Sequence, residues 1–476
     1  MTGKDLYNND DNSVIDKAGM ALNPSPKGLL LPGVDPTTHH EATRLCARDY
    51  LENHAFFNDK QFHNHLNHHL LAAFSLGGSA KRLQEIFDIN NSYQRPLSAP
   101  ASDVTITVDN YTEYLGKEEY YPNYIAFYRS ELAKSRGDFN AVVSRYFFDP
   151  QIFPLAMSGL LHPFIQLGYG LEFKSEAIIA CALAQASIHR KQFSRAFDTE
   201  TFDEICRSAS KSDENSVAGL SLVDILDCMR SDPITAKITY NDEPYAQENR
   251  GHAEDLAIKY AKLWTVEHSE SAVKEKAKEI MSVIALVYGS LTRPGFRPVL
   301  EFGVMHNLTS SYFLPIYMDA LTLENQVRLL HAYIVPFLYM YASKGCPLLY
   351  IPLELTSTNT HYAESSESLG DNPWTYVINK AITNNDMHVA KVVRALWRLS
   401  LLTTFPGQAK FVDEYELPPF VNCLYLARTT VDNVSKSVRR DSVTDKMLLK
   451  SNEDDQGWAH GMLAFDEFWT MQPTEL

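Results

Sequence analysis

Apolar residues recur at three- and four-residue spacing through most of this chain, and this helical period constrains the fold more than any other feature of the sequence. Clear examples are residues 175–193, 323–345 and 386–402. The alternation of apolar and polar residues that marks a strand is clear only at residues 104–108, Val-Thr-Ile-Thr-Val. The sequence therefore predicts an all-α fold.

The chain of 476 residues shows neither a fixed-period repeat nor an interdomain linker. We expect a single large multi-helical body with irregular long loops, in which residues 39–435 form the helical catalytic domain. Residues 1–38 are rich in Asn, Asp, Pro and Gly and predict an irregular N-terminal arm. Residues 436–476 pass from charged to aromatic and predict a C-terminal extension that packs back on the body.

Charge and cysteine usage exclude several classes of partner. The net charge of -16 disfavours nucleic acid and anionic membrane surfaces as partners. The six cysteines are scattered without a CxxC pair, which favours a reducing compartment, and the N-terminus resembles no secretory signal. The apolar runs at residues 280–291 and 333–342 are too short to span a membrane. We therefore expect a cytoplasmic protein whose oligomeric state the sequence leaves open.

Common catalytic motifs are missing from the chain. The sequence contains no GxGxxG after a strand and no GxxxxGK[ST], so neither a dinucleotide fold nor a P-loop is indicated. It also lacks HExxH and GxSxG, the signatures of zincins and α/β-hydrolases. A flavin or NADPH enzyme of the common kind is therefore disfavoured.

Sixteen histidines are present, and five of them fall between His54 and His69. If this stretch is drawn as a helix, His65 and His69 lie four positions apart on one flank of its apolar face. Such a pair can bind one metal ion from a single helix. The alternative is that these histidines are solvated or are satisfied core residues.

Two further histidines stand in apolar surroundings. His162 precedes Pro163, which predicts that both belong to the first turn of a helix. His306 is surrounded by apolar and small hydroxyl residues. A buried histidine needs a partner, because an unpaired polar group costs about 1 to 3 kcal/mol. That partner could be a backbone carbonyl, a hydroxyl group or a metal, so a structural role remains open for both.

His388 and Lys391 lie one turn apart at the start of another predicted helix. Asn385 or Asp386 can cap this helix. Lys391 falls on the same flank as His388, at the edge of the apolar stripe. The alternative is that the lysine lays its methylenes on apolar surface and keeps its ammonium group in water.

The chain is rich in aromatic residues, with 25 Tyr and 24 Phe. Tyr124, Phe127 and Tyr128 crowd one short segment, and Tyr169 and Tyr312 lie close in sequence to His162 and His306. A flat polycyclic phenol or quinone could stack on such rings. The alternative is that most of them belong to the helix core.

Five segments resemble the questin oxidase-like family, whose fungal members tailor aromatic polyketides. They read, in order, NHLNHHLLAAFSLGG, YPNYIAFYRSEL, LLHPFIQLGYGLEF, FGVMHNLTSSYFLP and MHVAKVVRAL. The resemblance implies a non-haem iron site held by His65, His162, His306, His388 and a carboxylated Lys391, whose carbamate carbon comes from carbon dioxide. His69 is a reserve ligand. Gln166 and Tyr169 depart from more His-rich forms of their motif and are candidate substrate contacts.

No Asp or Glu lies in the cores of these motifs, so a carbamate on Lys391 would supply the anionic oxygen that such iron sites commonly contain. The resemblance implies a dioxygenase that cleaves a ring carbon-carbon bond of an anthraquinone or its hydroquinone, with dioxygen as co-substrate. Three alternatives remain: an NADPH-dependent Baeyer-Villiger oxygenase, a metal-dependent hydrolase and an inert helical scaffold.

Overall fold

Helices are the main regular elements of the fold. A computed structural model describes residues 9–26, 28–207, 219–240, 247–356, 372–402, 421–434, 458–470 and 472. In these ranges the regular elements are α-helices and short 3-10 helices, and extended pairing is limited to isolated bridges such as that between Glu301 and Ala459. The predicted all-α class is therefore confirmed. Most of the predicted C-terminal extension, residues 436–457, lies outside the described residues.

The chain divides into two compact units. The first unit comprises Met1–Gln192 and Phe313–Leu321, and the second comprises Phe193–Tyr312 and Thr322–Leu476. The short stretch Phe313–Leu321 thus belongs with the first unit although the second surrounds it in the sequence.

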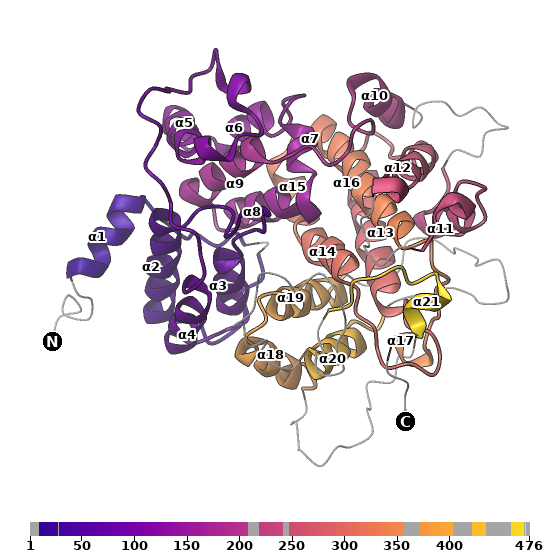
Figure 1. The fold of residues 1–476 in the computed structure, drawn as a ribbon. Coiled ribbons are helices and arrows are strands. Elements are labelled where there is room, and N and C mark those ends of the chain that lie inside the picture. Colours follow the sequence, from indigo (N-terminus) through magenta and orange to yellow (C-terminus); the bar gives the residue numbers. More distant parts are fainter. Residues whose placement is uncertain are drawn as a thin grey trace. The chain divides into compact units, whose positions relative to one another are not determined.

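The first unit contains the following helices (Figure 1): α1 (Asn9–Ala18), α2 (Pro36–Glu52), α3 (Leu66–Ser75), α4 (Ala80–Asn91), η1 (Tyr111–Tyr114), η2 (Glu118–Tyr120), α5 (Tyr121–Lys134), α6 (Phe139–Tyr146), α7 (Phe153–Ala156), η3 (Gly159–Leu161), α8 (His162–Glu172), α9 (Glu176–Ile188) and α15 (Leu314–Ala320). Helices α2, α3 and α4 pack together, and α9 packs against both α5 and α8. Every residue of α8 is buried.

Helix α15 completes the packing around α8. Gly168 provides the space, because a Cβ atom at this position would lie 2.3 Å from Cγ of Phe313. The ring of Tyr317 stacks on Phe164 at 4.4 Å, and its hydroxyl donates to the Phe164 carbonyl. Phe313 also meets Tyr169 edge to face.

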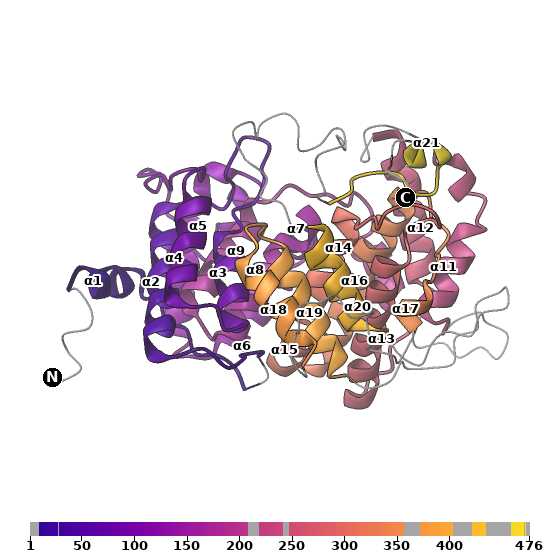
Figure 2. The same ribbon diagram turned by 90° about the horizontal axis from the view of Figure 1, so that it is seen from below.

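The second unit contains the remaining helices: α10 (Thr199–Arg207), α11 (Leu222–Arg230), η5 (Thr235–Lys237), α12 (Gln247–Ala261), α13 (Glu270–Gly289), α14 (Phe302–Ser311), α16 (Leu323–Ser343), α17 (Leu353–Thr356), α18 (Trp374–Thr383), α19 (Val389–Ser400), α20 (Cys423–Asn433) and α21 (Asp466–Trp469). Helices α18, α19 and α20 lie side by side (Figures 1 and 2). Helix α19 also packs on α14, which brings the starts of these two helices together.

Three local expectations differ from the structure. Helix α3 begins at Leu66, so residues 62–65 precede the helix instead of forming its first turn. The reason is local: Phe56 bridges to His63, and the Asn64 side chain accepts a hydrogen bond from the Leu66 amide. Residues 104–108 form no strand. Residues 1–38, expected to be irregular, contain α1, which packs on α2.

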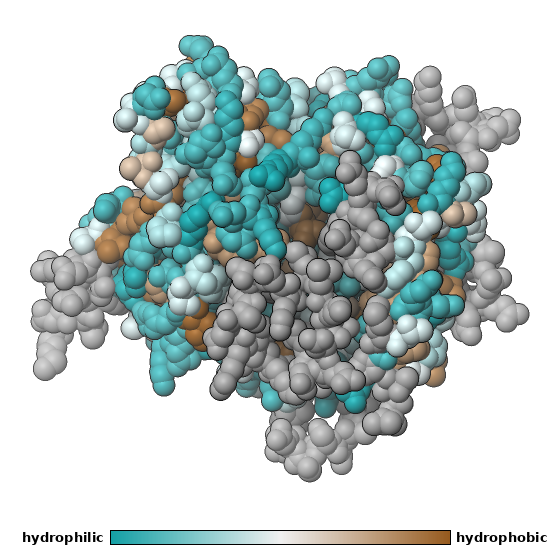
Figure 3. Space-filling model, viewed as in Figure 1, coloured by the Kyte–Doolittle hydropathy of each residue, from teal (hydrophilic) through white to brown (hydrophobic). Residues whose placement is uncertain are grey.

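Hydrophobic side chains are mostly buried in the described residues. On the face that Figure 3 shows, hydrophilic residues predominate among those drawn in colour. Within the described residues, every helix is too short or too polar to cross a bilayer.

Candidate functional site

His65 and His162 form a close pair in the first unit. His65 immediately precedes α3, and His162 is the first residue of α8, with Pro163 in its first turn as predicted. Both side chains are buried, and their Nε2 atoms lie 2.8 Å apart. The two rings stand almost perpendicular to each other.

The tautomer of each ring in this pair follows from its other nitrogen. Nδ1 of His65 lies 2.6 Å from the carbonyl oxygen of His63, and Nδ1 of His162 lies 2.5 Å from that of Gly159. A carbonyl can only accept, so each Nδ1 carries a hydrogen and each Nε2 carries a lone pair. Two nitrogen lone pairs can face each other at 2.8 Å only when a proton or a cation lies between them. The pair therefore suits a metal ion.

A left-handed turn holds His162 in place. Gly159, Leu160 and Leu161 all have positive φ, with values of 56°, 54° and 63°. For the two leucines this conformation costs about 1 to 2 kcal/mol each. Glycine is required at the first position, because a Cβ atom there would lie 2.1 Å from Nε2 of His189. Backbone strain of this kind concentrates at functional sites.

His63 and His189 extend this cluster of imidazoles, although neither was expected to have a role. The ring of His63 stacks on that of His162 at 3.9 Å, and its Nε2 lies 3.0 Å from Nε2 of His189. Nδ1 of His189 donates to the Arg190 carbonyl, so its Nε2 accepts from His63. Burial lowers the pKa of His189, which keeps this ring neutral. His189 ends a helical pattern and carried no signal that could have identified it.

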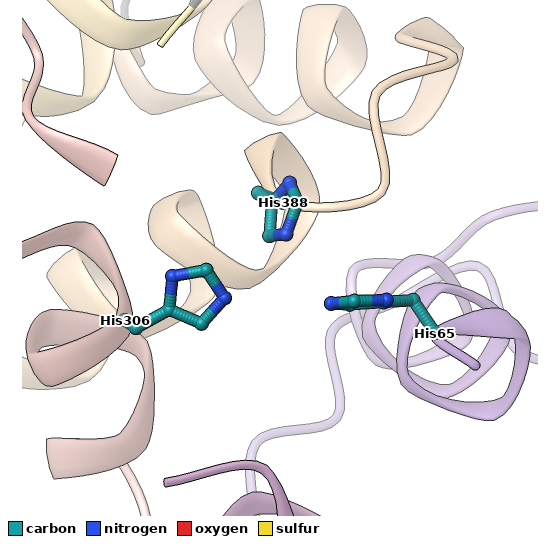
Figure 4. A group of neighbouring side chains, drawn as sticks. All are labelled: His65, His306 and His388. Carbon is teal, nitrogen blue, oxygen red and sulfur yellow. The ribbon is translucent and has the colours of Figure 1, made fainter. Parts of the chain in front are cut away.

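His306 and His388 form the corresponding pair in the second unit. Figure 4 shows His306 on α14 and His388 at the start of α19, with their rings turned toward each other; it also draws His65 at the start of α3. The ring centroids of His306 and His388 lie 5.1 Å apart. Phe302 lies beside both rings, at 4.4 Å and 5.2 Å.

The same tautomer recurs in this second pair. Nδ1 of His306 donates to the Phe302 carbonyl at 2.8 Å. Nδ1 of His388 lies 3.2 Å from Oδ1 of Asp386, which also accepts from the His388 amide. Burial alone would raise the pKa of Asp386, but the charge and hydrogen bonds of His388 outweigh it and hold that pKa well below its usual value. Oδ1 of Asp386 accepts from Nδ1 of His388, so Nε2 is the acceptor of this ring whenever the ring is neutral.

Lys391 follows His388 by one turn on α19. Its side chain is only 3% exposed, and Nζ has no hydrogen-bond partner among the described residues. Burial lowers the pKa of Lys391 to about 7, against the opposing effect of Asp386. A lysine that only covered apolar surface would keep its ammonium group in water. Lys391 is instead a buried amine that is partly neutral at physiological pH.

The aromatic candidates have internal partners in the structure. Tyr124 donates to the Tyr111 carbonyl and Tyr128 pairs with Ser187, so both hydroxyl groups serve the packing of α5. Phe127 packs on Tyr146.

The remaining predicted residues lie on the same helices as the histidines or next to them in the sequence. Tyr169 stacks on His68 at 5.3 Å, and buried Gln166 lies one turn after His162 on α8. The Tyr312 ring lies 4.0 Å from the guanidinium of buried Arg394, a contact that no sequence pattern predicted. His69 is fully buried on α3, one turn after His65.

An all-helical chain whose buried histidines present Nε2 lone pairs in two close pairs belongs to the class of candidate metalloproteins. Sequence comparison identifies it further. A profile of the family described as questin oxidase-like matches residues 62–396, a range that contains all five predicted ligands. The chain belongs to the questin oxidase-like family.

Individual relatives agree with this assignment. The chain is 30% identical to Baeyer-Villiger oxidase ptaJ of Pestalotiopsis fici, over 78% of this chain and 81% of that protein. It is 28% identical to oxidoreductase AflY of Aspergillus parasiticus, over 75% and 71%. It is 27% identical to questin oxidase of Aspergillus fumigatus, over 75% and 80%. The protein is therefore an oxidoreductase of this family.

Proposed function

We propose that the protein is a non-haem iron dioxygenase of fungal aromatic polyketide biosynthesis that cleaves a ring carbon-carbon bond of an anthraquinone or its hydroquinone. One observation carries the proposal. All four histidines of the family motifs donate from Nδ1 to an oxygen atom, which makes Nε2 the acceptor in each ring. Histidine metal ligands commonly have this arrangement.

The ligand set combines both histidine pairs with one lysine. His65, His306 and His388 each offer a ring nitrogen suited to a metal ion, and His162 joins His65 through the contact between their Nε2 atoms. Lys391 completes the set with an anionic oxygen once it is carboxylated. When bound, iron would activate dioxygen beside the electron-rich substrate.

The carboxylation of Lys391 requires only the neutral amine and carbon dioxide. The neutral amine attacks carbon dioxide, the new N–C bond forms, and one proton leaves the nitrogen for solvent, which gives a carbamate of charge -1. The lowered pKa of Lys391 supplies the neutral amine, because burial disfavours the ammonium form. The residue lies one turn from His388, so both side chains can reach the same ion.

Elemental analysis of the purified protein is the first test. We expect close to one iron per chain and dioxygen uptake coupled to the loss of a dithionite-reduced anthraquinone. Lys391→Ala should abolish both metal retention and turnover, whereas Lys380→Ala, which alters an exposed lysine on α18, should alter neither. Protein grown with ¹³C-bicarbonate should show a carbamate carbon resonance that Lys391→Ala removes. Full activity in metal-free protein would contradict the proposal.

The second candidate is an NADPH-dependent Baeyer-Villiger oxygenase acting on the same substrate class. The name of one relative, Baeyer-Villiger oxidase ptaJ, favours it. Turnover measured with and without NADPH separates the two candidates: the dioxygenase needs no added reductant once its iron and substrate are reduced, whereas insertion of a single oxygen atom consumes one NADPH per turnover. A hydrolase would turn over without dioxygen.

A further inference from the structure

The C-terminal segment of residues 458–460 lies against the starts of α14 and α19, which carry His306 and His388. Ala459 forms a parallel bridge with Glu301: its amide donates to the Leu300 carbonyl, and its carbonyl accepts from the Phe302 amide. On the other side, the indole N–H of Trp458 donates to Oδ2 of Asp386 at 3.2 Å. All these contacts are made within the second unit.

Each of these contacts is one step away from an imidazole. The carbonyl of Phe302 accepts from Nδ1 of His306, and the amide of the same residue donates to Ala459. Asp386 accepts from Nδ1 of His388 through Oδ1, and from Trp458 through Oδ2. The short segment therefore connects the two groups that fix the orientation of the two rings.

The start of α14 is also fixed by a second set of contacts. Glu301 caps the helix by accepting from the Val304 amide, and its other oxygen pairs with Lys344 at 2.7 Å in a fully buried ion pair. The ring of His460 packs on Phe302 at 4.5 Å. Glu301 thus cannot shift without breaking a buried ion pair, so Ala459 is attached to a rigid part of the unit.

We propose that residues 458–460 form a clamp that orients His306 and His388 for metal binding, with Asp386 and Trp458 as positioning residues. The inference rests on the proposed function in that it requires a metal ion at these histidines. A carboxylate that holds a ligand histidine commonly sets metal affinity, and its loss costs about 10- to 100-fold. The indole N–H holds that carboxylate in turn.

The test uses the full-length, metal-free protein titrated with Co²⁺, whose affinity is measured by chelator competition and whose visible absorption reports the coordination geometry. Asp386→Asn should weaken Co²⁺ binding about 10- to 100-fold, because His388 and Trp458 donate to different oxygens of Asp386 and the NH2 group that replaces one of them cannot accept. Trp458→Phe should weaken binding in the same direction but less. In the Asp386→Asn background, Trp458→Phe should have no further effect, because it acts through Asp386.

Matched controls separate this effect from a general destabilisation of the protein. Trp397→Phe alters a tryptophan on α19 that packs on Trp374, and Asp466→Asn alters an exposed carboxylate at the start of α21. Both should leave the Co²⁺ affinity and spectrum unchanged, and the unfolding midpoints of these two metal-free control variants should match that of the wild type.

Three results would count against these proposals, and they differ in what they overturn. If wild-type protein binds Co²⁺ and both Asp386→Asn and Trp458→Phe bind it equally well with the same spectrum, the clamp is wrong while the proposed function survives. The same holds if Trp458→Phe weakens binding equally in both backgrounds. If the wild type binds neither Co²⁺ nor iron, the proposed function fails and the clamp fails with it.

Discussion

Lys391 is the predicted ligand whose acid-base chemistry departs most from its usual behaviour. Its amine is buried, and burial lowers its pKa from 10.5 to about 7. This displacement has a cost in folding, because the unfolded chain keeps a proton that the folded chain releases. A residue selected only for stability would not impose such a cost, which supports a role in function.

Replacing Lys391 by Met tests this cost directly. Lys391→Met keeps the length of the side chain and removes the charge, so at pH 6.5 the metal-free variant should be more stable than metal-free wild type by a few kcal/mol, since a tenfold change in the proton equilibrium corresponds to about 1.4 kcal/mol. Denaturant unfolding of both proteins measures the difference, and the variant should retain no metal.

The pH dependence of this difference has a definite sign. Between about pH 7 and 10.5 the unfolded wild-type chain binds the lysine proton and the folded chain does not, so wild-type stability rises with pH across this window. The advantage of Lys391→Met is therefore complete below pH 7 and shrinks toward pH 10.5. An advantage that grew with pH would contradict the lowered pKa.

His331 provides a contrasting case of a buried histidine outside the ligand set. It is fully buried on α16 beside Trp264, and neither ring nitrogen has a hydrogen-bond partner among the described residues. Burial and the charge of Lys276 lower its pKa to about 4. His331→Leu should leave the metal content unchanged and raise stability by about 1 to 3 kcal/mol, the cost of the unsatisfied polar group. Metal analysis and thermal unfolding check this, and loss of metal would show that His331 belongs to the site.

Sequence reasoning identified individual side chains better than their partners. Asn385 or Asp386 was expected to cap the helix, but the cap residue of α19 is His388, which makes no side-chain capping bond, and Asp386 instead accepts from the His388 amide. Its link to Trp458 could not be predicted, because 72 residues separate the two in the chain. The burial of Lys391 was equally unpredictable, because its spacing in the sequence placed it only at the edge of an apolar stripe.

Among the elements, the left-handed turn before α8 has the most direct effect on a predicted ligand. Gly159 accepts from His162 through its carbonyl, and a Cβ atom at this position would meet His189. Gly159→Ala should therefore displace His162 and lower stability by about 1 to 3 kcal/mol, with a weaker affinity for Co²⁺. Unfolding and metal titration measure both effects.

Gly251→Ala is the matched control. Gly251 lies inside α12 without a positive φ, and no atom lies within 4 Å of the place that a Cβ atom would take. The added methyl group should therefore be neutral or should stabilise the protein by up to about 1 kcal/mol. A Gly159→Ala protein that behaved like Gly251→Ala would show that the turn tolerates a side chain.

Helix positions were predictable where an apolar stripe is long, as in α16 and α19, because burial of that stripe decides the structure. The start of α3 was not predicted. Histidines at 65 and 69 fitted a helix pattern, but the Asn64 side chain and the bridge at His63 impose a turn that no helical periodicity reveals.

At the scale of the molecule, metal binding should stabilise the folded chain by mass action. A ligand present at 100 times its dissociation constant adds about 2.7 kcal/mol to the free energy of unfolding when only the folded state binds it. Removing the metal with a chelator should therefore lower the unfolding midpoint, and adding it back should restore the midpoint. The His388→Ala variant should show neither change, and an equal response from that variant would place the bound metal elsewhere.

The division into two units could not be read from the sequence. The boundaries at residues 192, 312 and 321 fall where neither composition nor charge changes, and Tyr312 and Phe313 are neighbours in one family motif yet belong to different units. What assigns Phe313 to the first unit is its fit against Gly168, a contact across 145 positions.

Helix α15 has a consequence for how the chain is made. A ribosome delivers the chain from its N-terminus, and domains generally fold as they emerge. The first unit, however, lacks the helix that covers α8 until residue 321 has been synthesised, by which point residues 193–312 of the second unit already exist. Until then Phe164 and Gly168 have no α15 to pack against. The first unit therefore cannot complete its folding while residues 193–312 of the second unit are being synthesised.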